Sequence, residues 1–484
     1  MALSFEIFPL NSSRKTKKSK TKNGVFLMSG FLSDKKYLLS SRSAREIFSE
    51  IKSLPIVDPH NHANVAEISA NENYPDLWQL FAATDHYIWE TMRKRGVPES
   101  HITGSVDNKE KWLKLSSVFP EIAGNPAYEW MHLDLKRYLG IDELISPENG
   151  NKIWEKGLKV LKKESKKPQN LLRKMGVETM CSTDDPVDDL KHHSALNENF
   201  GSMLVRPTWR PDKVMNILAP GWSEYIAKFE KRFATEINSV GEIMEVLRKS
   251  HDYFAEFGCV ASDHGVDMPP SGTGNKEQAE KIFKMAKTGV IPNKAEAQIF
   301  KDWIFGELAS LDAEKDWVFQ IHIGAVRDVR DSLMKGLGPD SGGDVSDHFI
   351  DMLPPLAKLL NRFDDRLKVV LYCLDPGHQP TLTTLARAFG SKVRLGSAWW
   401  LCDTPIGMRR QLEYICSVDL FANFAGMVSD SRKLLSYGSR FEMFRRILSD
   451  VLGRMVDLGQ IPMNVAVPLA EKIAYSEPKK FFNL

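Results

Sequence analysis

His60 and His62 have the residue type and the spacing of a metal-binding pair. Both follow the apolar run 54–57, within the motif D-P-H-N-H. Side chains at positions i and i+2 of an extended chain point to one side, so the two imidazoles would share a face. A carboxylate from elsewhere would complete a divalent metal site, and Asp430, directly after another apolar run, is our candidate. The alternative is a chance proximity of two histidines in a loop, because H-x-H alone is a weak motif.

Two arginines could act on a negatively charged substrate. Arg432 lies two residues after Asp430 and would share its direction if the chain stays extended; a local turn pairing of the two is the alternative. Arg210, in R-P-T-W-R-P-D, has a guanidinium fork that matches a carboxylate bidentately. Its alternative is an ion pair with Asp212 that only braces the loop.

Aromatic, acidic and histidine side chains after other apolar runs are further candidates. Trp399 and Trp400 could present a ring face to a sugar, although paired tryptophans often belong to the core. Asp184 and Asp185 precede a proline and could form an Asx turn, and we assign that structural role to one of them. Active sites of barrel enzymes are built at strand ends. Five of the twelve histidines fall at or just after expected strand ends: His60, His62, His264, His322 and His378.

Eight short apolar runs, each followed by a polar cluster, indicate the elements that carry these residues. Their length, their β-branched content and the turn residues beside them are typical of buried parallel strands. Strand and helix patterns that alternate eight times predict a closed (β/α)8 barrel of the TIM type. An open doubly wound sheet is the alternative, but no G-x-G-x-x-G loop follows the first run. The expected strands are 54–57, 177–181, 203–205, 259–261, 317–319, 368–373, 393–395 and 422–428.

The interval between the first two expected strands is too long for a loop. It exceeds 110 residues and contains aromatic-rich stretches with helical periodicity. We predict a large helical insertion there, at about 65–175, that packs over one mouth of the barrel. Near the C-terminus, apolar spacing from Phe441 to Met455 predicts a helix, with Ser439 and Glu442 as a capping box at its start.

The composition is that of a soluble globular protein. Hydrophobic residues make up 42%, charged residues 26%, and the formal net charge is +2, too balanced for a nucleic-acid or membrane surface. The five cysteines are scattered and never form C-x-x-C, which favours reduced thiols and a cytoplasmic location. Residues 1–27 carry six basic side chains and one acid, and we expect a disordered leader there, or a true start at Met28. A nucleic-acid-binding arm at 14–22 is another interpretation of the basic run.

Eight ordered motifs together resemble the uronate isomerases (glucuronate isomerase), a branch of the amidohydrolase superfamily. The resemblance runs from about residue 29 to the C-terminus. The motifs are D-P-H-N-H (58–62), T-D-H-Y (84–87), S-T-D-D-P (182–186), P-T-W-R-P-D (207–212), Q-I-H-I-G-A-V-R-D (320–328), L-G-P-D-S-G (337–342), A-W-W (398–400) and S-D-S-R (429–432).

The resemblance implies one metal-dependent-hydrolase-like domain at 28–484, built on a distorted (β/α)8 barrel. It also implies an aldose–ketose isomerase that interconverts D-glucuronate with D-fructuronate and D-galacturonate with D-tagaturonate. The cofactor would be a divalent metal ion, zinc in first place and manganese or iron as alternatives. Metal ligands would be His60, His62 and Asp430; catalytic residues Tyr87, Asp430, Arg432 and His322; substrate-binding residues His86, Arg210, Trp399 and Trp400. The chain departs from the usual family pattern at Asp328, Leu401–Cys402 and Ser429. The departure at Leu401–Cys402 could alter the substrate pocket.

The implied chemistry is proton transfer between C2 and C1 through an enediolate. Tyr87 or a neighbour would handle the C2 proton, which requires Arg432 or the metal to lower the ordinary tyrosine pKa of about 10. Arg432 would stabilise the enediolate, Asp430 would assist ring opening and Arg210 would hold the substrate carboxylate. A hydride shift assisted by the metal is the rival mechanism.

Two other function classes stay open. A metal-dependent hydrolase on the same barrel would often use a bridging lysine after the fourth strand, and the absence of lysine at the expected strand ends favours an isomerase. A non-catalytic sugar-acid-binding protein would not need both the H-x-H pair and the pair formed by Asp430 and Arg432. The expected partners are a small uronate and further copies of the chain in a homo-oligomer, without nucleic acid or membrane.

Overall fold

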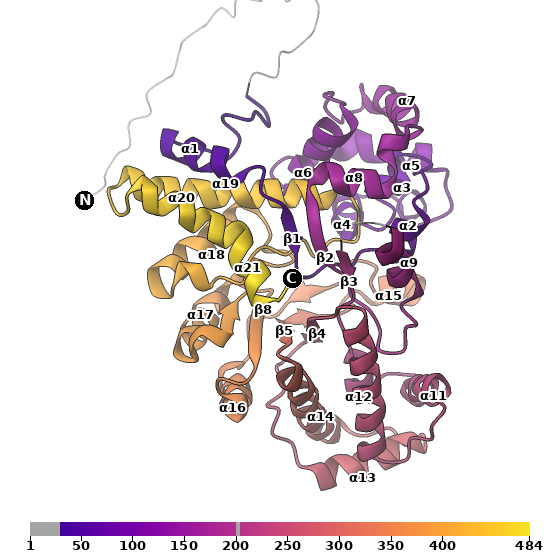
Figure 1. Ribbon diagram of the computed structural model, residues 1–484. Helices are drawn as coiled ribbons and strands as arrows, with labels where there is room; N and C mark the ends of the chain where they lie inside the picture. The colour runs from indigo at the N-terminus through magenta and orange to yellow at the C-terminus, as the bar shows by residue number, and fades with distance from the viewer. Residues whose placement is uncertain (1–29, 200–203) are drawn as a thin grey trace, which may run out of the picture. The chain divides into compact units, whose positions relative to one another are not determined.

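The computed structural model describes residues 30–199 and 204–484 (Figure 1). The chain divides into residues 1–37 and a compact unit, Leu38–Leu484, which contains every strand of the described residues. The leader expected at 1–27 lies outside the described residues. Within the described part, no helix is both long and apolar enough to cross a membrane.

Seven parallel strands form two sheets in the middle of the compact unit (Figure 1). Each of the seven overlaps a run that the sequence predicts to be a strand. The first sheet has the order β1-β2-β3, with β1 at Ile56–Asp58, β2 at Val177–Cys181 and β3 at Leu204–Arg206. The second has the order β4-β5-β8-β9, with β4 at Ala261–Val266, β5 at Val318–Ile323, β8 at Lys368–Cys373 and β9 at Val393–Leu395. An antiparallel pair, β6 (Ala325–Val326) and β7 (Val345–Ser346), follows β5.

Single backbone contacts connect the first sheet to the second beyond β3. The amide of Trp209 donates to the carbonyl of Ala261 (3.2 Å), and the carbonyl of Trp209 accepts from Asp263 (3.1 Å). On its other side, Trp209 forms a parallel bridge with Asp184, just after β2. The two sheets are therefore continuous through this residue.

The eighth expected strand, 422–428, is not a strand. Phe421–Asn423 forms a 3-10 turn, and the chain then continues without regular structure. Gly426 has φ +98°, and a Cβ there would lie 2.4 Å from Pro478 Cγ, in helix α21 (Glu477–Phe481). The close approach of this helix requires a backbone conformation that a regular strand does not have.

The segment still lies between the two remaining sheet edges. The amide of Ala425 donates to the carbonyl of Leu395 in β9 (3.1 Å). Further along, Asp430 donates to the carbonyl of His60 (3.2 Å), and His62 donates to the carbonyl of Ser431 (3.1 Å). The polar residues after this segment are thereby held beside the motif that follows β1.

Helices fill the long interval between β1 and β2, as the sequence predicts. Asparagine or aspartate side chains cap the N-termini of α2 to α6. Figure 1 shows these helices gathered beside β1–β3. They are α2 (Val65–Ala70), α3 (Leu77–Phe81), α4 (His86–Lys94), α5 (Asn108–Val118), α6 (Pro126–Asp134), α7 (Gly150–Leu161) and α8 (Pro168–Met175).

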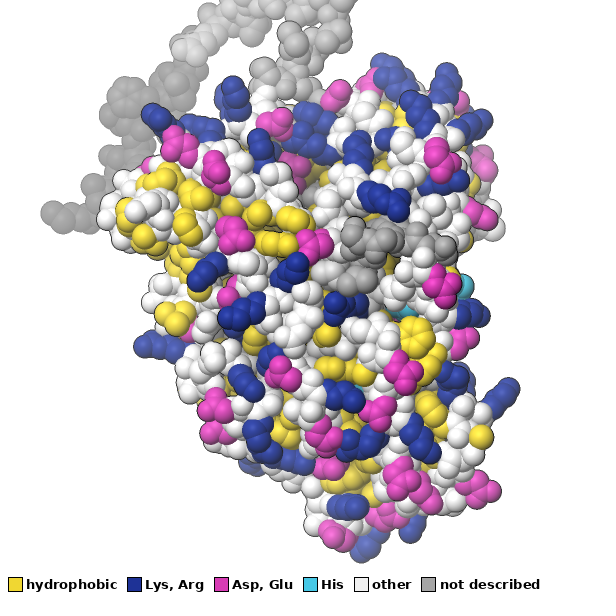
Figure 2. Space-filling view, in the orientation of Figure 1, with side chains coloured by type: hydrophobic (Ala, Val, Ile, Leu, Met, Phe, Trp, Pro, Cys, Tyr) yellow, Lys and Arg dark blue, Asp and Glu magenta, His cyan; other side chains and the backbone are white. Residues whose placement is uncertain are grey.

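The remaining long helices lie outside the strands (Figure 1). Their inner faces bury apolar residues, as an amphipathic helix against a sheet requires. On the face shown in Figure 2, side chains of both charges are interspersed. These helices are α11 (Trp222–Phe233), α12 (Val240–Glu256), α13 (Lys276–Lys287), α14 (Lys294–Lys315), α16 (Leu353–Phe363), α17 (Gln379–Ala388), α18 (Pro405–Val418), α19 (Ser436–Asp457) and α20 (Met463–Glu471).

Helix α19 contains the expected C-terminal helix but begins earlier than its capping-box pattern predicts. It starts at Ser436, so Ser439 is a buried residue inside the helix rather than its N-cap. Glu442 pairs instead with Arg137 (2.9 Å) and Arg446 (2.8 Å). The capping-box assignment is wrong because the true start depends on packing against the rest of the unit.

Candidate active site

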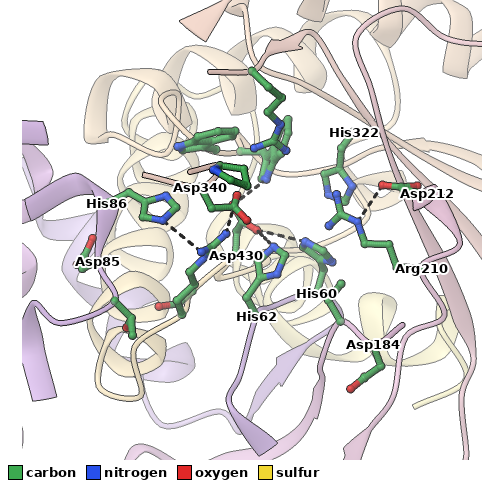
Figure 3. Close-up of a pocket in the computed structure, with 18 of the residues that line it drawn as sticks. His60, His62, Asp85, His86, Asp184, Arg210, Asp212, His322, Asp340 and Asp430 are labelled. Atoms are coloured by element: carbon green, nitrogen blue, oxygen red, sulfur yellow. Dashed lines mark hydrogen bonds and ion pairs between the residues drawn. The ribbon is translucent and has the colours of Figure 1, made fainter. Parts of the chain in front are cut away.

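A cavity of about 800 Å³ lies where the strands end, and all ten residues to which the sequence assigns a role line it. They come from widely separated segments, and Figure 3 shows several of them directed toward one another. The ten are His60, His62, His86, Tyr87, Arg210, His322, Trp399, Trp400, Asp430 and Arg432.

The two histidines of the H-x-H motif converge on Asp430. The Nε2 atoms of His60 and His62 each lie 3.2 Å from Asp430 Oδ1. Trp399 Nε1 donates to the other carboxylate oxygen (2.9 Å), which fixes the orientation of the group. Burial alone would raise the pKa of Asp430, but the hydrogen bonds from both histidines outweigh burial and hold it well below its usual value. Asp430 is therefore a carboxylate at neutral pH.

Asp263 forms a second centre beside the first, and sequence reasoning missed it. Its fully buried carboxylate lies 3.5 Å from His60 Nδ1, 3.2 Å from His322 Nδ1 and 3.2 Å from Arg210 Nη1. Burial favours a high pKa, but Arg210 and then His60 hold the pKa of Asp263 well below its usual value. The sequence singled out the neighbouring His264 instead.

Alternation along β4 explains why Asp263 rather than its neighbour faces the site. Successive side chains of a strand point to opposite faces. His264 is buried on the opposite face of the strand, with its ring centre 4.1 Å from that of Phe319. The signal was present in the sequence: a carboxylate one position before the histidine, in a strand whose two faces differ.

Arg210 is held by two carboxylates. Its Nε donates to Asp212 Oδ2 (2.9 Å) and its Nη1 to Asp263 Oδ2 (3.2 Å). The pair with Asp212, the alternative considered for this arginine, is thus present. These bonds engage two of the five N–H donors of the guanidinium.

The histidines and aspartates fit a divalent metal ion. Two groups, His60/His62/Asp430 and His60/Asp263/His322, each place their ligand atoms within 4.8 Å of one another. His60 Nδ1 and both ring nitrogens of His322 are buried without a well-formed hydrogen bond among the described residues. Imidazole nitrogen and carboxylate oxygen suit zinc, manganese and iron alike. Burial, with the charge of His60, lowers the pKa of His322 to about 4, so that ring is neutral and available as a ligand.

Tyr87 has different partners from those expected. Its hydroxyl donates to Asp403, at 2.9 and 2.8 Å from the two carboxylate oxygens. Arg440 donates to the same carboxylate (2.5 Å) and lies 5.0 Å from the centre of the Tyr87 ring. Burial and the charge of Asp403 raise the pKa of Tyr87 well above its usual value. The lowered pKa that we expected is not found, because Asp403 rather than Arg432 contacts the hydroxyl.

Asp403 and Arg440 are also residues that sequence reasoning missed. Both are almost fully buried. Burial raises the pKa of Asp403, and Arg440 opposes that rise only in part. No local motif indicates the pair, since the two residues lie 37 positions apart, in a loop and in helix α19.

Arg432 lies at the more open side of the cavity. Its Nη1 lies 3.2 Å from His86 Nε2 and its Nη2 lies 3.2 Å from Asp340 Oδ1. The turn pairing of Arg432 with Asp430, considered from the sequence, is not among the ion pairs of the described residues. Burial and the charge of Arg432 lower the pKa of His86 to about 4. His86 is therefore neutral at physiological pH and can accept a hydrogen bond.

The two tryptophans are buried, yet both line the cavity. Trp399 contacts His322, with ring centres 4.6 Å apart, and orients Asp430 as described above. The guanidinium of Arg327 lies 5.0 Å from the centre of the Trp400 ring. The two tryptophans therefore belong to the buried core and also form part of the cavity wall.

Two neighbouring aspartates both line the cavity, and one of them also forms the turn that the sequence predicts. Asp185 accepts from the amide of Val187 (3.1 Å), which is the Asx turn. Asp184 lines the cavity, and burial raises its pKa to about 7. Among the five histidines at expected strand ends, His264 and His378 do not line the cavity.

Comparisons with known proteins agree with the motif resemblance. The sequence model of the family described as glucuronate isomerase matches residues 28–482. The uronate isomerase of Thermotoga maritima is 48% identical over 446 residues, which cover 92% of this chain and 98% of the relative. The uronate isomerase of Bacillus pumilus is 34% identical over 466 residues, covering 94% and 97%.

Solved structures give the same result. The crystal structure of the Thermotoga maritima uronate isomerase matches with a TM-score of 0.91 at 48% identity, covering 93% of this chain and 99% of that one. The crystal structure of glucuronate isomerase from Caulobacter crescentus matches with a TM-score of 0.88 at 26% identity, covering 92% and 96%.

Proposed function

The chain belongs to the glucuronate isomerase family and is an isomerase, and from that premise we propose that it interconverts aldo- and keto-uronates. The substrate pairs are D-glucuronate with D-fructuronate and D-galacturonate with D-tagaturonate. The observation that carries the proposal is the meeting of all ten assigned residues at one polar cavity. A proton moves between C2 and C1 through an enediolate.

The proposed scaffold is a distorted (β/α)8 barrel within one domain at 28–484. Seven parallel strands, the Trp209 bridge and the irregular segment 424–431 support closure of the ring. The carboxyl ends of barrel strands share one rim, which agrees with the common position of His60, Arg210 and His322.

His60, His62 and Asp430 would hold a divalent metal ion, zinc in first place and manganese or iron as alternatives. His322 and Asp263 would support His60 from the other side. The bound ion would supply Lewis-acid polarisation of a substrate oxygen. Asp430 would also assist opening of the sugar ring by accepting a hydrogen bond from a sugar hydroxyl, which its ionised state allows.

The C2 proton is assigned to Tyr87 acting together with Asp403. A phenol with a raised pKa is a poor base by itself. When the Tyr87 oxygen takes the C2 proton, its own proton can pass along the existing hydrogen bond to Asp403. Arg440 keeps this carboxylate in place and balances its charge. The reverse transfer delivers a proton to C1.

Arg432, neutral His86 and Arg210 would act on the substrate's charged and polar groups. Arg432 would stabilise the enediolate, and His86, which lies 3.2 Å from it, would bind a sugar hydroxyl. Arg210 would reach the uronate carboxylate with the part of its guanidinium that Asp212 and Asp263 leave free. Trp399 and Trp400 form the wall against which the sugar packs.

Location and assembly are further parts of the proposal. All five cysteines are free thiols, four of them buried, which suits the reducing cytoplasm. The substrate is a small uronate, and the balanced charge does not favour a nucleic-acid or membrane partner. A homo-oligomer stays a prediction.

The direct test is incubation of the purified protein with D-glucuronate and with D-galacturonate, followed by an assay for ketose. Failure to form ketose from either sugar contradicts the proposal. With C2-deuterated substrate in ordinary water, loss of the label supports proton transfer through an enediolate. Retention of the label at C1 of the product supports the hydride shift instead.

A further inference from the structure

A second group of metal-type ligands, His348, Asp375 and His378, lies apart from the catalytic cavity. None of the three lines that cavity. His348 follows β7, and the other two follow β8, where Asp375 is the N-cap of the short 3-10 turn Pro376–His378 and His378 is its last residue. Each residue offers a ligand atom, and these atoms lie within 4.8 Å of one another. The proposed isomerisation uses none of them.

His378 is prepared as a ligand by its surroundings. The side chain is buried, with 8% of the residue exposed. Its Nε2 lies 2.8 Å from the carbonyl oxygen of His348, which can only accept, so Nε2 carries the proton. The lone pair is then on Nδ1, and that atom is buried without a hydrogen-bond partner among the described residues. Metal-bound histidines typically donate their other N–H to a carbonyl in this way.

The other two ligands face each other at the surface side of the group. His348 Nδ1 lies 2.9 Å from Asp375 Oδ2, a separation that two ligands of one ion can have. The second oxygen of Asp375 accepts from the amide of Gly377 (2.6 Å), which holds the carboxylate in position. Burial would raise the pKa of Asp375, but the amide of Gly377 and the side chain of His348 outweigh it and lower the pKa. The side chain of His348 is 63% exposed, so a water ligand can reach the remaining position.

Gly377 provides the space that the group needs. A Cβ at this position would lie 3.0 Å from His348 Cε1 and 3.0 Å from Asp375 Oδ1. The rings of His348 and His378 are nearly parallel, at an angle of 7° with centres 5.6 Å apart. The glycine thus allows an imidazole from one segment to lie over the turn that carries the other two ligands.

We propose that His348, Asp375 and His378 form a second site for a divalent transition-metal ion, with zinc as the fitting example. Two imidazole nitrogens and one carboxylate oxygen suit Zn²⁺, Co²⁺ or Ni²⁺ better than Ca²⁺ or Mg²⁺, which prefer oxygen ligands. The ion displaces the proton between His348 and Asp375, so binding weakens in acid.

The proposed ion has a structural role. The segment from β6 to β7 carries Arg327 and Asp340, which line the catalytic cavity, and His348 lies at the end of this segment. Asp375 and His378 belong to the turn after β8. Metal bound by all three residues would tie the end of the segment to the sheet.

The test measures Zn²⁺ binding to the full chain after removal of metal by chelation. Equilibrium dialysis compares the wild-type protein with His348→Ala, with Asp375→Asn and with the double variant His60→Ala/His62→Ala. His192→Ala, which removes an exposed histidine outside the group, is the matched control. The absorption spectrum of bound Co²⁺ provides an independent measurement of which ligands hold the ion.

We expect His348→Ala and Asp375→Asn to bind one equivalent of Zn²⁺ fewer than the wild-type protein and His192→Ala. Affinity at this site should fall by more than the roughly 10- to 100-fold that loss of an outer partner costs. The double variant His60→Ala/His62→Ala should retain one equivalent, and Zn²⁺ should still raise its Tm. Equal uptake and equal affinity in His348→Ala, Asp375→Asn and the wild-type protein would overturn the second site. This result is independent of whether the catalytic cavity binds metal.

Discussion

Two buried carboxylates behind the cavity lining, Asp263 and Asp403, have pKa values that are shifted in opposite directions. Asp263 is surrounded by Arg210, His60 and His322, and these neighbours hold its pKa well below the usual value. Asp403 meets one arginine and the hydroxyl of Tyr87, and burial raises its pKa. The two side chains are almost equally inaccessible to water. Their difference therefore comes from their neighbours.

This difference distinguishes two roles of a buried carboxylate, which can either hold neighbouring cations in place or transfer a proton. A carboxylate that stays ionised can fix cations and metal ligands without changing state. A carboxylate with a raised pKa takes up a proton more readily, as acid–base catalysis requires. We therefore assign Asp263 to positioning and Asp403 to proton transfer.

The largest expected effect follows from Asp263→Asn. The change leaves the charge of buried Arg210 only partly balanced, and loss of one partner of a buried pair costs about 3–5 kcal/mol. Urea denaturation should show this loss of unfolding free energy, and metal content should fall because His60 loses its support. Asp184→Asn is the matched control, because Asp184 has a pKa of about 7 and is already partly neutral at that pH. Equal losses in the two variants would contradict the assignment of Asp263.

The second effect concerns turnover rather than stability. Asp403→Asn removes the acceptor of the Tyr87 proton, and we expect kcat to fall roughly 100- to 10,000-fold with little change in KM. Tyr87→Phe should cause a similar loss. Because the two residues act as a unit, the double variant should be no slower than either single one. If the fold losses in kcat of the two single variants multiply in the double variant, Tyr87 and Asp403 act independently.

The pH dependence distinguishes the two carboxylates without a large structural change. Protonated Asp403 cannot accept the Tyr87 proton, so kcat/KM should fall as pH falls through the raised pKa of Asp403. Asp263 stays ionised throughout this range, because its pKa lies well below 3.8. If kcat/KM of Asp403→Asn falls over the same pH range, the fall must be assigned to another group.

The sign of the stability effect is also opposite for the two groups. The folded pKa of Asp263 is lower than the unfolded one, so its stabilisation is present above about pH 3.9 and is lost as pH falls through the folded pKa. The folded pKa of Asp403 is higher than the unfolded one, so its ionisation weakens the fold as pH rises through the folded pKa. When Tm is measured as a function of pH, the Asp403→Asn variant should lack the loss of stability that ionisation of Asp403 causes.

The smallest expected effect is that of Asp212→Asn. Asp212 also pairs with Arg210, but its side chain is 23% exposed and Asp263 remains as a partner. We expect a loss of about 1 kcal/mol, near the upper end for partly exposed pairs. Urea denaturation of Asp212→Asn and Asp263→Asn under the same conditions gives the ratio of their losses of unfolding free energy. A cost equal to that of Asp263→Asn would mean that burial does not distinguish the partners of Arg210.

Local pattern was sufficient for the strands and for the primary metal candidates. Seven of the eight expected strands are present, because short apolar runs with turn residues on both sides have few other ways to be buried. The direction of His60 and His62 follows from the i, i+2 spacing alone. Asp430 was found because it follows a buried apolar run, although that run is not a strand in the structure.

Local pattern was insufficient where contact with a distant segment decides the conformation. The segment 422–428 has strand-like composition, but Gly426 must accommodate Pro478. The start of α19 moved to Ser436 for a similar reason, since nearly all of its first turns are buried by other elements. Neither contact leaves a periodic signal in the nearby sequence.

The amino-acid sequence by itself indicated the family, most of the strands and the three side chains that meet at one centre, His60, His62 and Asp430, because residue type and spacing fix the direction of a side chain along its own element. Only the tertiary structure decided which charge faces which. Tyr87 received Asp403 and Arg440 in place of Arg432, and Asp263 became a partner of His60. The physical reason is that a pKa depends on burial and on charges within a few ångströms, and those neighbours come from parts of the chain that are far apart in sequence.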